Sequence, residues 1–412
     1  MKNDQIPTTA VAQTRGNRGL WEFLLSELKP RGKFLTPFNI ITIPILIIGA
    51  VLIVIRFVYG LGSVTNLSQE FPWGLWVGFD VVTGVAFAGG AYSLTFIVYV
   101  LNMKKYHSIV RATVLNGFLA YVFYAGALTL DLGRPWHIIN PIIGNKFGLS
   151  SILFLVAWHF LLYMMSELIE FSPAIAEWLG MRRLRKALKA MTIGAVVFGI
   201  ALSSLHQSGL GALFLMAKGK IHPLWYTQFI PLLFLVSSIF AGMSIIIIEG
   251  TITHKIFASQ IDPNEKAHEN DIILGLSKIA VGAMFVYLFM EGIQLIHGQK
   301  IHLLATSWGG LFLTEVLGFV LLPALLFMRG IQTKNMITLR IAAIWTALGI
   351  ALNRLDVSII AFKWYAPHHY YPSVGEIMIT LFVISAEFWA FRWIVNRMPV
   401  FYEHPDFKEE TE

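Results

Sequence analysis

The sequence predicts an all-α polytopic membrane protein with about ten transmembrane helices. Hydrophobic residues make up 56% and charged residues 13% of the 412-residue chain, and the mean hydropathy is +0.66. Soluble domains carry about 25% charged residues, so this composition excludes an ordinary soluble protein. A transmembrane helix needs roughly 20 apolar residues. Segments of that length are predicted at 38–60, 73–102, 109–132, 149–171, 187–208, 228–253, 272–297, 308–328, 337–360 and 374–397.

The segments between these helices are short, so we expect one helical domain, residues 38–398, between a basic arm (1–37) and a short tail (399–412). The arm has no early apolar core followed by a cleavage site, so no cleavable signal peptide is expected. The chain has no cysteine, which excludes a disulfide and a thiolate-ligated iron–sulfur cluster within it.

The distribution of positive charge predicts the orientation. When the loops are numbered from the N-terminus, 23 of the 31 lysines and arginines fall on the side that holds both termini. The positive-inside rule places that side in the cytoplasm, and the bacterial inner membrane is the expected location. The net charge of +7 therefore reflects topology, and no nucleic-acid partner is expected. Tryptophans at predicted outer helix ends, such as Trp136 and Trp225, agree with this orientation.

A short internal repeat indicates two related halves. The segment FAGGAYS at 87–93 resembles FAGMSII at 240–246, and each is followed downstream by an acidic residue at a predicted outer helix end, Asp131 and Glu291. Two four-helix bundles plus extra helices would account for this pattern, because many membrane folds are built from repeats. Small residues four apart in the second helix would allow close helix packing.

Ionisable residues inside the predicted helices are the main functional candidates, because charge within a bilayer is costly. Trp73, Trp76 and Asp80 share one helix face by their i, i+3, i+7 spacing. Further polar residues map to the outer half of the membrane: Asp131, Arg134, His206, Gln207, Glu291, Arg354 and Asp356. Others lie deeper (His159, Glu315, Glu387) or toward the cytoplasm (Glu167, Glu170, Glu249).

The outer polar cluster has the composition of a quinone site. Aromatic walls would contact the quinone ring, His or Arg would bind its carbonyls, and acids would supply protons. Two alternatives stay open: Asp131 and Arg134 could form a local ion pair, and His206 could be satisfied by a neighbouring carbonyl. In LHQSGLGAL (205–213) the helix is expected to end near residue 208, because glycines commonly follow a helix C-terminus.

Haem is not expected in this chain. A haem b needs paired axial histidines that face each other within the membrane. Within the predicted helices the candidates are His159 and His206, with His254 and His297 at helix ends. No predicted helix carries two well-spaced histidines at membrane depth.

Short motifs occur in a recognisable order along the chain: FPWGLWVGFD (71–80), YHSIVR (106–111), LTLDLGRPWH (128–137), LHQSGLGAL (205–213), HPLW (222–225) and EG (249–250). Over about residues 38–398 the sequence resembles the NrfD-like family, the polysulfide-reductase-type membrane subunits of respiratory complexes. It is similar to the branch that holds the membrane subunits of the menaquinone reductase complex, which we favour, and of the periplasmic uptake hydrogenase.

The resemblance implies a haem-free subunit that passes electrons to menaquinone near the outer face. Electrons would come from a periplasmic, ferredoxin-like iron–sulfur subunit, with multihaem-cytochrome or hydrogenase subunits as further partners. His206 would contact a quinone carbonyl, Asp80 and Asp131 would be its acidic neighbours, and Arg134 would orient Asp131. The rest of the quinone pocket would be formed by Gln207, Trp73 and Trp76.

Proton uptake from the cytoplasm is a further expectation. His159, Glu167, Glu249 and Glu387 could serve as stepping points, with water between them because direct hydrogen-bond steps span about 3 Å. Two other classes of function remain: a secondary transporter, whose site would usually lie at the membrane midplane, and a redox-inactive anchor for periplasmic subunits.

Overall fold

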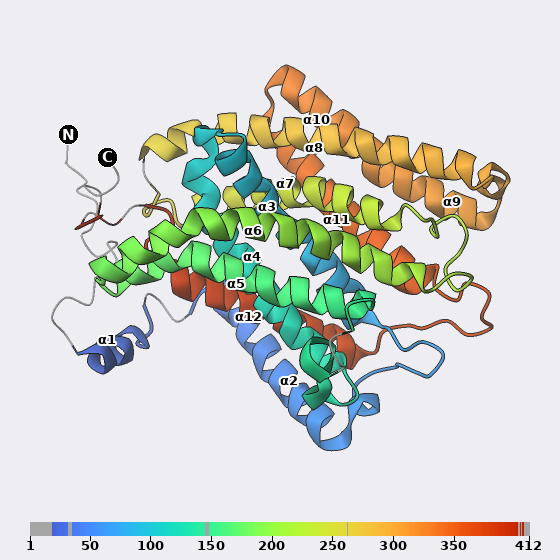
Figure 1. Ribbon diagram of the computed structural model, residues 1–412, viewed down its shortest axis with the longest axis horizontal. Coiled ribbons are helices and arrows are strands. Elements are labelled where there is room, and N and C mark those ends of the chain that lie inside the picture. Colours follow the sequence, from blue (N-terminus) through green and yellow to red (C-terminus); the bar gives the residue numbers. More distant parts are fainter. Residues whose placement is uncertain are drawn as a thin grey trace.

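Among the described residues, ten helices are long and apolar enough to cross a membrane in the computed structural model of the chain (Figure 1). This confirms the predicted all-α polytopic fold. The structure describes residues 19–31, 35–144, 148–261, 263–402, 404 and 406–407, so much of the predicted basic arm and the last residues of the tail lie outside it. The crossing elements are α2 (Pro37–Tyr59), η3–α3–η4 (Trp76–Thr83, Gly84–Thr95, Phe96–Val100), α4 (His107–Asp131), α5 (Ile152–Trp178), α6 (Arg182–Leu215), α7 (Ile230–Ile256), α8 (Pro263–His297), α9–η9–α10 (Ser307–Leu313, Thr314–Leu321, Leu322–Thr333), α11–η10 (Met336–Leu355, Asp356–Ile360) and α12 (Val374–Val395).

The helices form two packed halves that meet between α3 and α7. The first half contains α3–α6, and the second contains α7, α8, α10 and α11. The two halves of the predicted repeat lie at their crossing: a Cβ atom on Gly242 would come within 2.2 Å of the backbone nitrogen of Gly90, and one on Gly89 within 2.9 Å of the Ser238 carbonyl oxygen. Small residues therefore let the two helix backbones touch.

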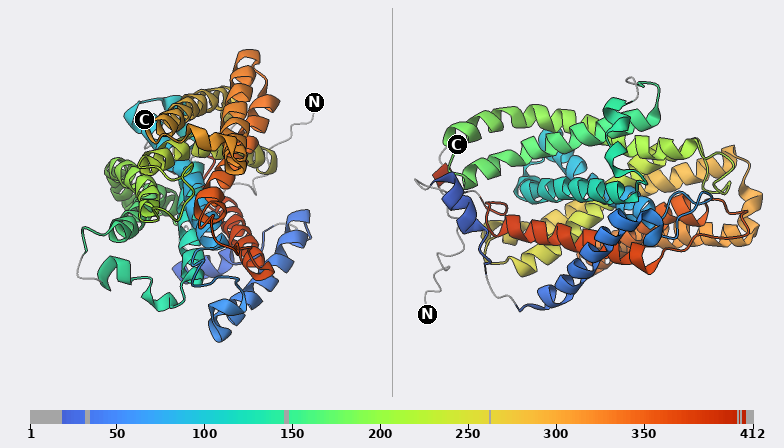
Figure 2. Two further views of the ribbon diagram at one scale, coloured as in Figure 1. Left: turned by 90° about the vertical axis from the view of Figure 1, so that its right-hand side faces the viewer. Right: turned by 90° about the horizontal axis from the view of Figure 1, so that it is seen from below.

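Helices α12 and α2 cover one side of the first half. α12 packs against α4 and η3, and α2 packs on α12, as Figure 2 shows in blue and red. Polar contacts join the two helices: the Trp389 indole donates to Thr42 at 2.8 Å, and Arg392 donates to Asn39 at 2.8 Å.

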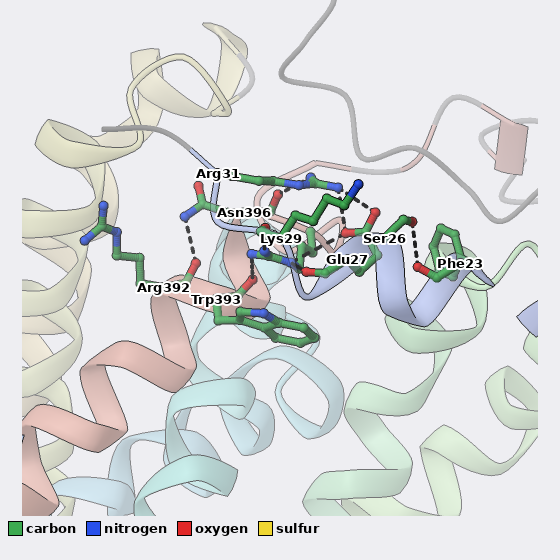
Figure 3. Close-up of polar contacts among 9 residues, drawn as sticks. Phe23, Ser26, Glu27, Lys29, Arg31, Arg392, Trp393 and Asn396 are labelled. Atoms are coloured by element: carbon green, nitrogen blue, oxygen red, sulfur yellow. Dashed lines mark hydrogen bonds and ion pairs between the residues drawn. The ribbon is translucent and has the colours of Figure 1, made fainter. Parts of the chain in front are cut away.

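The described N-terminal segment lies at the end of the molecule where α12 ends (Figure 1), which we call the termini end; the opposite end is the far end. Helix α1 (Leu20–Glu27) contributes Glu27, whose carboxylate accepts from Arg31 at 2.6 Å and lies 3.5 Å from Arg397 beyond α12. Arg31 also donates to the Asn396 carbonyl at 2.8 Å (Figure 3). These contacts fasten α1 to the C-terminal end of α12.

The expected end of the fifth membrane helix near residue 208 is wrong. α6 continues to Leu215, so His206 lies about 14 Å along the helix from its far end. The two glycines of LHQSGLGAL serve close packing instead. A Cβ atom on Gly211 would lie 2.8 Å from the Ile230 carbonyl oxygen, and one on Gly209 2.8 Å from the Val156 side chain.

Candidate functional site

His206 points from α6 toward α4 and α5. Its Nδ1 lies 3.1 Å from the Val156 carbonyl oxygen on α5. Its ring packs against Tyr121 and Phe160, each with its ring centroid 5.6 Å away. The residue is 1% exposed, and its Nε2 has no hydrogen-bond partner among the described residues. The carbonyl-bound alternative is thus confirmed for one ring nitrogen, and the other remains available.

The bond to Val156 determines the chemistry of the His206 ring. A carbonyl oxygen only accepts hydrogen bonds, so Nδ1 must carry the proton. The neutral ring then presents a lone pair at Nε2, which accepts a hydrogen bond from a hydroxyl group. Nε2 can donate to a carbonyl only when the ring is protonated. His206 is therefore arranged to exchange a proton at Nε2.

A set of buried polar atoms continues from His206 toward the termini end. The hydroxyls of Tyr121, Tyr163 and Ser203 and both carboxylate oxygens of Glu167 make no hydrogen bond of normal geometry within the described part of the chain. They lie beside one another, with Ser203 near both tyrosines and Glu167 near Tyr163. The two tyrosine rings lie 4.9 Å apart. Buried polar atoms without protein partners commonly bind water or a ligand. We call these buried residues, together with His206, the His206 pocket; the name denotes the group of polar side chains and not an open cavity.

Two further candidates border the His206 pocket. His159 is one turn beyond Val156 on α5 and interacts electrostatically with His206. Glu170 interacts in the same way with Glu167. Sequence reasoning identified the charged members but missed Tyr121 and Tyr163, because a tyrosine in an apolar helix gives no sequence signal unless its position beside a histidine is known.

Asp80 lies on the other side of α4. It is 1% exposed, its Oδ2 accepts a hydrogen bond from Thr380 of α12 at 3.0 Å, and its Oδ1 is unpartnered within the described residues. Asp131 at the far end of α4 interacts electrostatically with Asp80. The predicted acidic pair is thus close, but its contacts are with α12 and α2, whereas those of His206 are with α4 and α5.

The expected Asp131–Arg134 pair is not formed. Arg134 is exposed, and it makes no ion pair with any residue that the structure describes. Arg56 of α2 takes its place: its guanidinium donates to the Leu130 carbonyl at 2.8 Å and to the Leu132 carbonyl, and it interacts electrostatically with Asp131. The ion pair expected from the i, i+3 spacing does not form because the helix ends at Asp131, ahead of Pro135, and Arg134 is exposed.

Two more acids extend from Asp80 toward the termini end. Glu387 of α12 interacts electrostatically with Asp80, and Glu249 of α7 interacts with Glu387. Glu249 accepts a hydrogen bond from Asn116. It also lines a cavity of about 60 Å³ near the termini end. The four predicted stepping points therefore separate into two groups, His159 and Glu167 on one side of α4 and Glu249 and Glu387 on the other.

The remaining predicted pocket residues do not converge on His206. Trp73 packs against Phe214 and Phe362, with centroids 5.7 and 5.4 Å away. Trp76 is buried, and its indole donates to the Glu376 carbonyl at 3.1 Å. Gln207 donates to the Val85 carbonyl of α3 at 2.7 Å. Trp73 and Trp76 therefore join other helices at the far end, while Gln207 ties α6 to α3 beside His206.

A second buried polar cluster lies in the second half. The Glu315 carboxylate accepts from the Trp225 indole at 2.7 Å and from Asn353 at 2.6 Å. Arg354 donates to Asn353 and to Ser237, each at 2.7 Å. Asp356 is buried beside Glu315, and neither of its carboxylate oxygens makes a hydrogen bond of normal geometry among the described residues. The sequence indicated the charged members of this cluster but not their partners.

Groups outside the crossing helices close this second cluster at the far end. Lys300 donates to the Tyr226 carbonyl at 2.7 Å and to Gln294 at 2.8 Å. Burial lowers the pKa of Lys300, and nearby Glu291 opposes that shift. His222 stacks on Trp308 with centroids 5.1 Å apart, and burial lowers the pKa of His222.

Three buried acids lie in π-helical stretches. Asp80 is in η3, Glu315 in η9 and Asp356 in η10. A π-helical turn shifts the register of the backbone hydrogen bonds and frequently marks functional sites. In η3 the Thr83 hydroxyl donates to the Gly78 carbonyl at 2.9 Å. The π-helical turns thus coincide with three ionisable residues, Asp80, Glu315 and Asp356, inside the membrane-spanning elements.

Residues 63–362 match the family described as polysulphide reductase, NrfD. A protein of Nitratidesulfovibrio vulgaris is 41% identical over 91% of this chain and 97% of its own length. The probable Ni/Fe-hydrogenase 2 b-type cytochrome subunit of Escherichia coli K12 is 30% identical over 90% of this chain and 93% of its own. The menaquinone reductase integral membrane subunit of Nitratidesulfovibrio vulgaris is 25% identical over 73% and 75%.

Proposed function

The chain belongs to the polysulphide reductase NrfD family, and we propose that it is the quinone-binding membrane subunit of a respiratory oxidoreductase complex. Relatives named as hydrogenase and menaquinone reductase subunits support a place in a redox complex. The observation that carries the quinone assignment is the free Nε2 of His206 beside unpartnered tyrosine hydroxyls. An interior that lacks protein partners for so many polar atoms favours a polar ligand.

The residues of the His206 pocket match a quinone head group. Reduction of menaquinone to menaquinol takes up two electrons and two protons. The hydroxyls of Tyr121 and Tyr163 can donate to a quinone carbonyl, and Nε2 of neutral His206 can accept from a quinol hydroxyl. Phe160 supplies an apolar wall for the ring. We therefore assign the tyrosines to quinone binding and His206 to proton exchange with the bound head group.

Asp80 and Asp131, expected as acidic neighbours of the quinone, contact α12 and α2 instead, so this proposal gives them no direct contact with the head group. Gln207 holds α6 against α3 beside the pocket through its bond to Val85. Arg56 replaces Arg134 as the cation that holds Asp131. Trp73 and Trp76 stabilise the far end instead of lining the quinone pocket.

The orientation follows the positive-inside rule. The termini end would face the cytoplasm of a bacterium, with the far end toward the periplasm and the chain in the inner membrane. A periplasmic iron–sulfur subunit would then deliver electrons at the far end, because this chain has no cysteine for a cluster of its own. Hydrogenase or multihaem-cytochrome subunits would complete the complex.

The similar proteins differ in the electron donor that their names indicate. The sequence favoured the menaquinone reductase type, yet identity and coverage are higher for the hydrogenase subunit of Escherichia coli. We therefore propose menaquinone as the acceptor without assigning the donor. Copurification followed by identification of the periplasmic subunits would name it.

Protons would reach the quinone from the cytoplasm along the His206 pocket. Glu170 and Glu167 precede Tyr163 and His206 in that direction, and water would bridge steps longer than about 3 Å. The acids on the other side of α4 do not end at His206. We expect Glu167→Gln to slow menaquinone reduction and Glu387→Gln to leave it near the wild-type rate; the reverse pattern would exclude this route.

Substitution of His206 tests the assignment most directly. In the intact complex, His206→Ala should lower menaquinone reduction by roughly 100-fold, the usual loss of a proton-transfer group. The matched control is His302→Ala, an exposed histidine near the far end. If the chain were only a redox-inactive anchor, the complex would reduce menaquinone at the wild-type rate with either variant. Copurification of the partner subunits would show that the complex of the His206→Ala variant has not dissociated.

A haem and a transport function are tested separately. Tyr121 and Phe160 contact the His206 ring, so we propose a haem-free chain and expect no haem α-band in a reduced-minus-oxidised spectrum of the purified subunit. A b-type spectrum that disappears in His206→Ala would overturn that proposal. A transporter would move its solute in vesicles without an electron donor, whereas this subunit would generate a potential only while it reduces quinone.

A further inference from the structure

A crevice of about 910 Å³ opens at the junction of the two halves, toward the termini end. It is bounded by η4 and the following turn on one side and by α8 on the other, with α6 and α7 at its base; α7 packs against both α6 and α8 (Figure 1). Its lining is mostly apolar, and Phe96 and Leu101 are 39% and 54% exposed on its wall. In a membrane this crevice is open to the lipid of one leaflet.

The lining residues change character along the crevice. The deep end holds Leu235 and Ile239 of α7 with Ser204 of α6. The mouth holds two lysines and one acid: Lys105 in the turn after η4, and Lys278 and Asp271 on α8. All three are exposed. An apolar interior thus leads to a mouth with a net charge of +1.

The two lysines lie beside the same stretch of α8. The Nζ of Lys105 is 3.1 Å from the position that a Cβ atom on Gly275 would occupy, and the Tyr106 hydroxyl is nearer still. Lys278 follows Gly275 by three residues, less than one helical turn. Asp271 precedes Gly275 by four residues on the same face, so it lies nearer the termini end than the lysines do.

We propose that this crevice binds an anionic phospholipid of the leaflet at the termini end. The acyl chains would occupy the apolar interior between η4 and α8. The phosphate would lie between Lys105 and Lys278, and the hydroxyls of a head group such as glycerol would donate to Asp271. The order of groups from the deep end to the mouth is the order of groups in such a lipid. Basic pockets between membrane helices are known to bind acidic head groups.

The charge pattern favours this ligand over phosphatidylcholine and over a quinone. A choline head group has no hydroxyl or N–H to donate to Asp271, and its net charge of zero does not complement the mouth. A quinone has a neutral head group, so its carbonyls can accept hydrogen bonds from the two ammonium groups but form no ion pair with them. The single negative charge of phosphatidylglycerol matches the mouth, and its two hydroxyls can reach an acceptor beyond the phosphate.

The test is native mass spectrometry of the complex, with phosphatidylglycerol, phosphatidylcholine or menaquinone added to the delipidated sample. The variant is Lys105→Gln/Lys278→Gln. The matched control is Lys186→Gln/Lys189→Gln, two exposed lysines of α6 far from the crevice. We expect wild type and control to retain phosphatidylglycerol and the crevice variant to bind it roughly thirtyfold more weakly, given the contribution of each lysine to anionic-lipid binding.

A second variant tests the interior. Ile239→Trp would fill the apolar base without changing charge, and it should lower phosphatidylglycerol binding while both mouth lysines remain. Equal retention of phosphatidylcholine, or an unchanged affinity in the lysine variant, would overturn the head-group assignment. Competition by menaquinone at the same crevice would identify it as a quinone passage instead. Absence of any retained lipid in wild type would also refute the proposal.

Discussion

Gly242 is the position where a single methyl group should test the two-half architecture most sharply. We consider Gly242→Ala in α7, with Gly250→Ala in the same helix as control. A Cβ atom at Gly242 would lie 2.2 Å from the Gly90 nitrogen and 2.4 Å from its Cα. At Gly250 nothing lies within 4 Å. The two variants make the same chemical change in one helix and differ in what the new methyl group meets.

The magnitude follows from the contact distances. Atoms in van der Waals contact lie about 3.5 Å apart, so α3 and α7 must separate by about 1 Å to admit the methyl group. The obstacle is backbone, which no rotamer change can relieve. Overpacking of this kind costs about 1–3 kcal/mol. Both substitutions gain up to about 1 kcal/mol of helix propensity, so that contribution cancels and the two variants should differ by about 1–3 kcal/mol.

Thermal unfolding in detergent, followed by loss of the monodisperse peak in size-exclusion chromatography, measures the difference. Scaling from soluble domains, Gly242→Ala should unfold roughly 5 °C below Gly250→Ala. Equal midpoints would show that α3 and α7 do not meet at these glycines. The repeat relationship between the two halves would then lose its structural basis.

Three further predictions concern single side chains. Arg56→Gln should destabilise the protein by about 3 kcal/mol, because it removes the cation beside Asp131. Arg134→Gln, at an exposed position, should change the stability by less than about 0.5 kcal/mol. Equal shifts of the unfolding midpoint would refute the assignment of Arg56 as the partner of Asp131. Glu27→Ala should speed tryptic cleavage next to α1 roughly tenfold, and unchanged cleavage would show that the ion pairs do not hold α1. Burial lowers the pKa of His222 in the folded protein. As the pH is lowered through about 6.5, the unfolded state therefore binds more protons than the folded state, and the protein becomes less stable. Between pH 7.5 and pH 5.5 the unfolding midpoint of His222→Phe should consequently drop less than that of wild type, and an equal drop would refute this.

The sequence was sufficient to predict the number of membrane helices and the charged residues within them. Hydropathy depends on composition over a window of about 20 residues, so a buried Asp80 or His206 stands out against its apolar neighbours. The FAGG and FAGM segments indicated two related halves, whereas the crossing of these two segments at their glycines is a finding of the structure. These predictions rest on local properties of the chain.

The errors arose where the answer depends on a distant partner. Arg134 is three residues from Asp131, yet the cation that reaches the acid is Arg56, supplied by α2. The glycines after His206 look like a helix end until the neighbouring helices are known. There, Pro231 and Val156 require small residues inside a continuing helix. Spacing within one segment could not distinguish these cases.

Helix α4 separates the buried polar groups into two lines. Tyr121 faces His206, and Tyr124, one turn later, faces Gly84 and interacts electrostatically with Glu387 and Asp80. His206 thus interacts with one tyrosine of α4 and Asp80 with another, one turn away. Glu167 and His159 of α5 therefore have different neighbours from Glu249 of α7 and Glu387 of α12. Glu387→Gln should consequently leave the rate of menaquinone reduction unchanged in a Glu167→Gln background as well as in wild type; a further loss of rate in the double variant would show that the two lines are one.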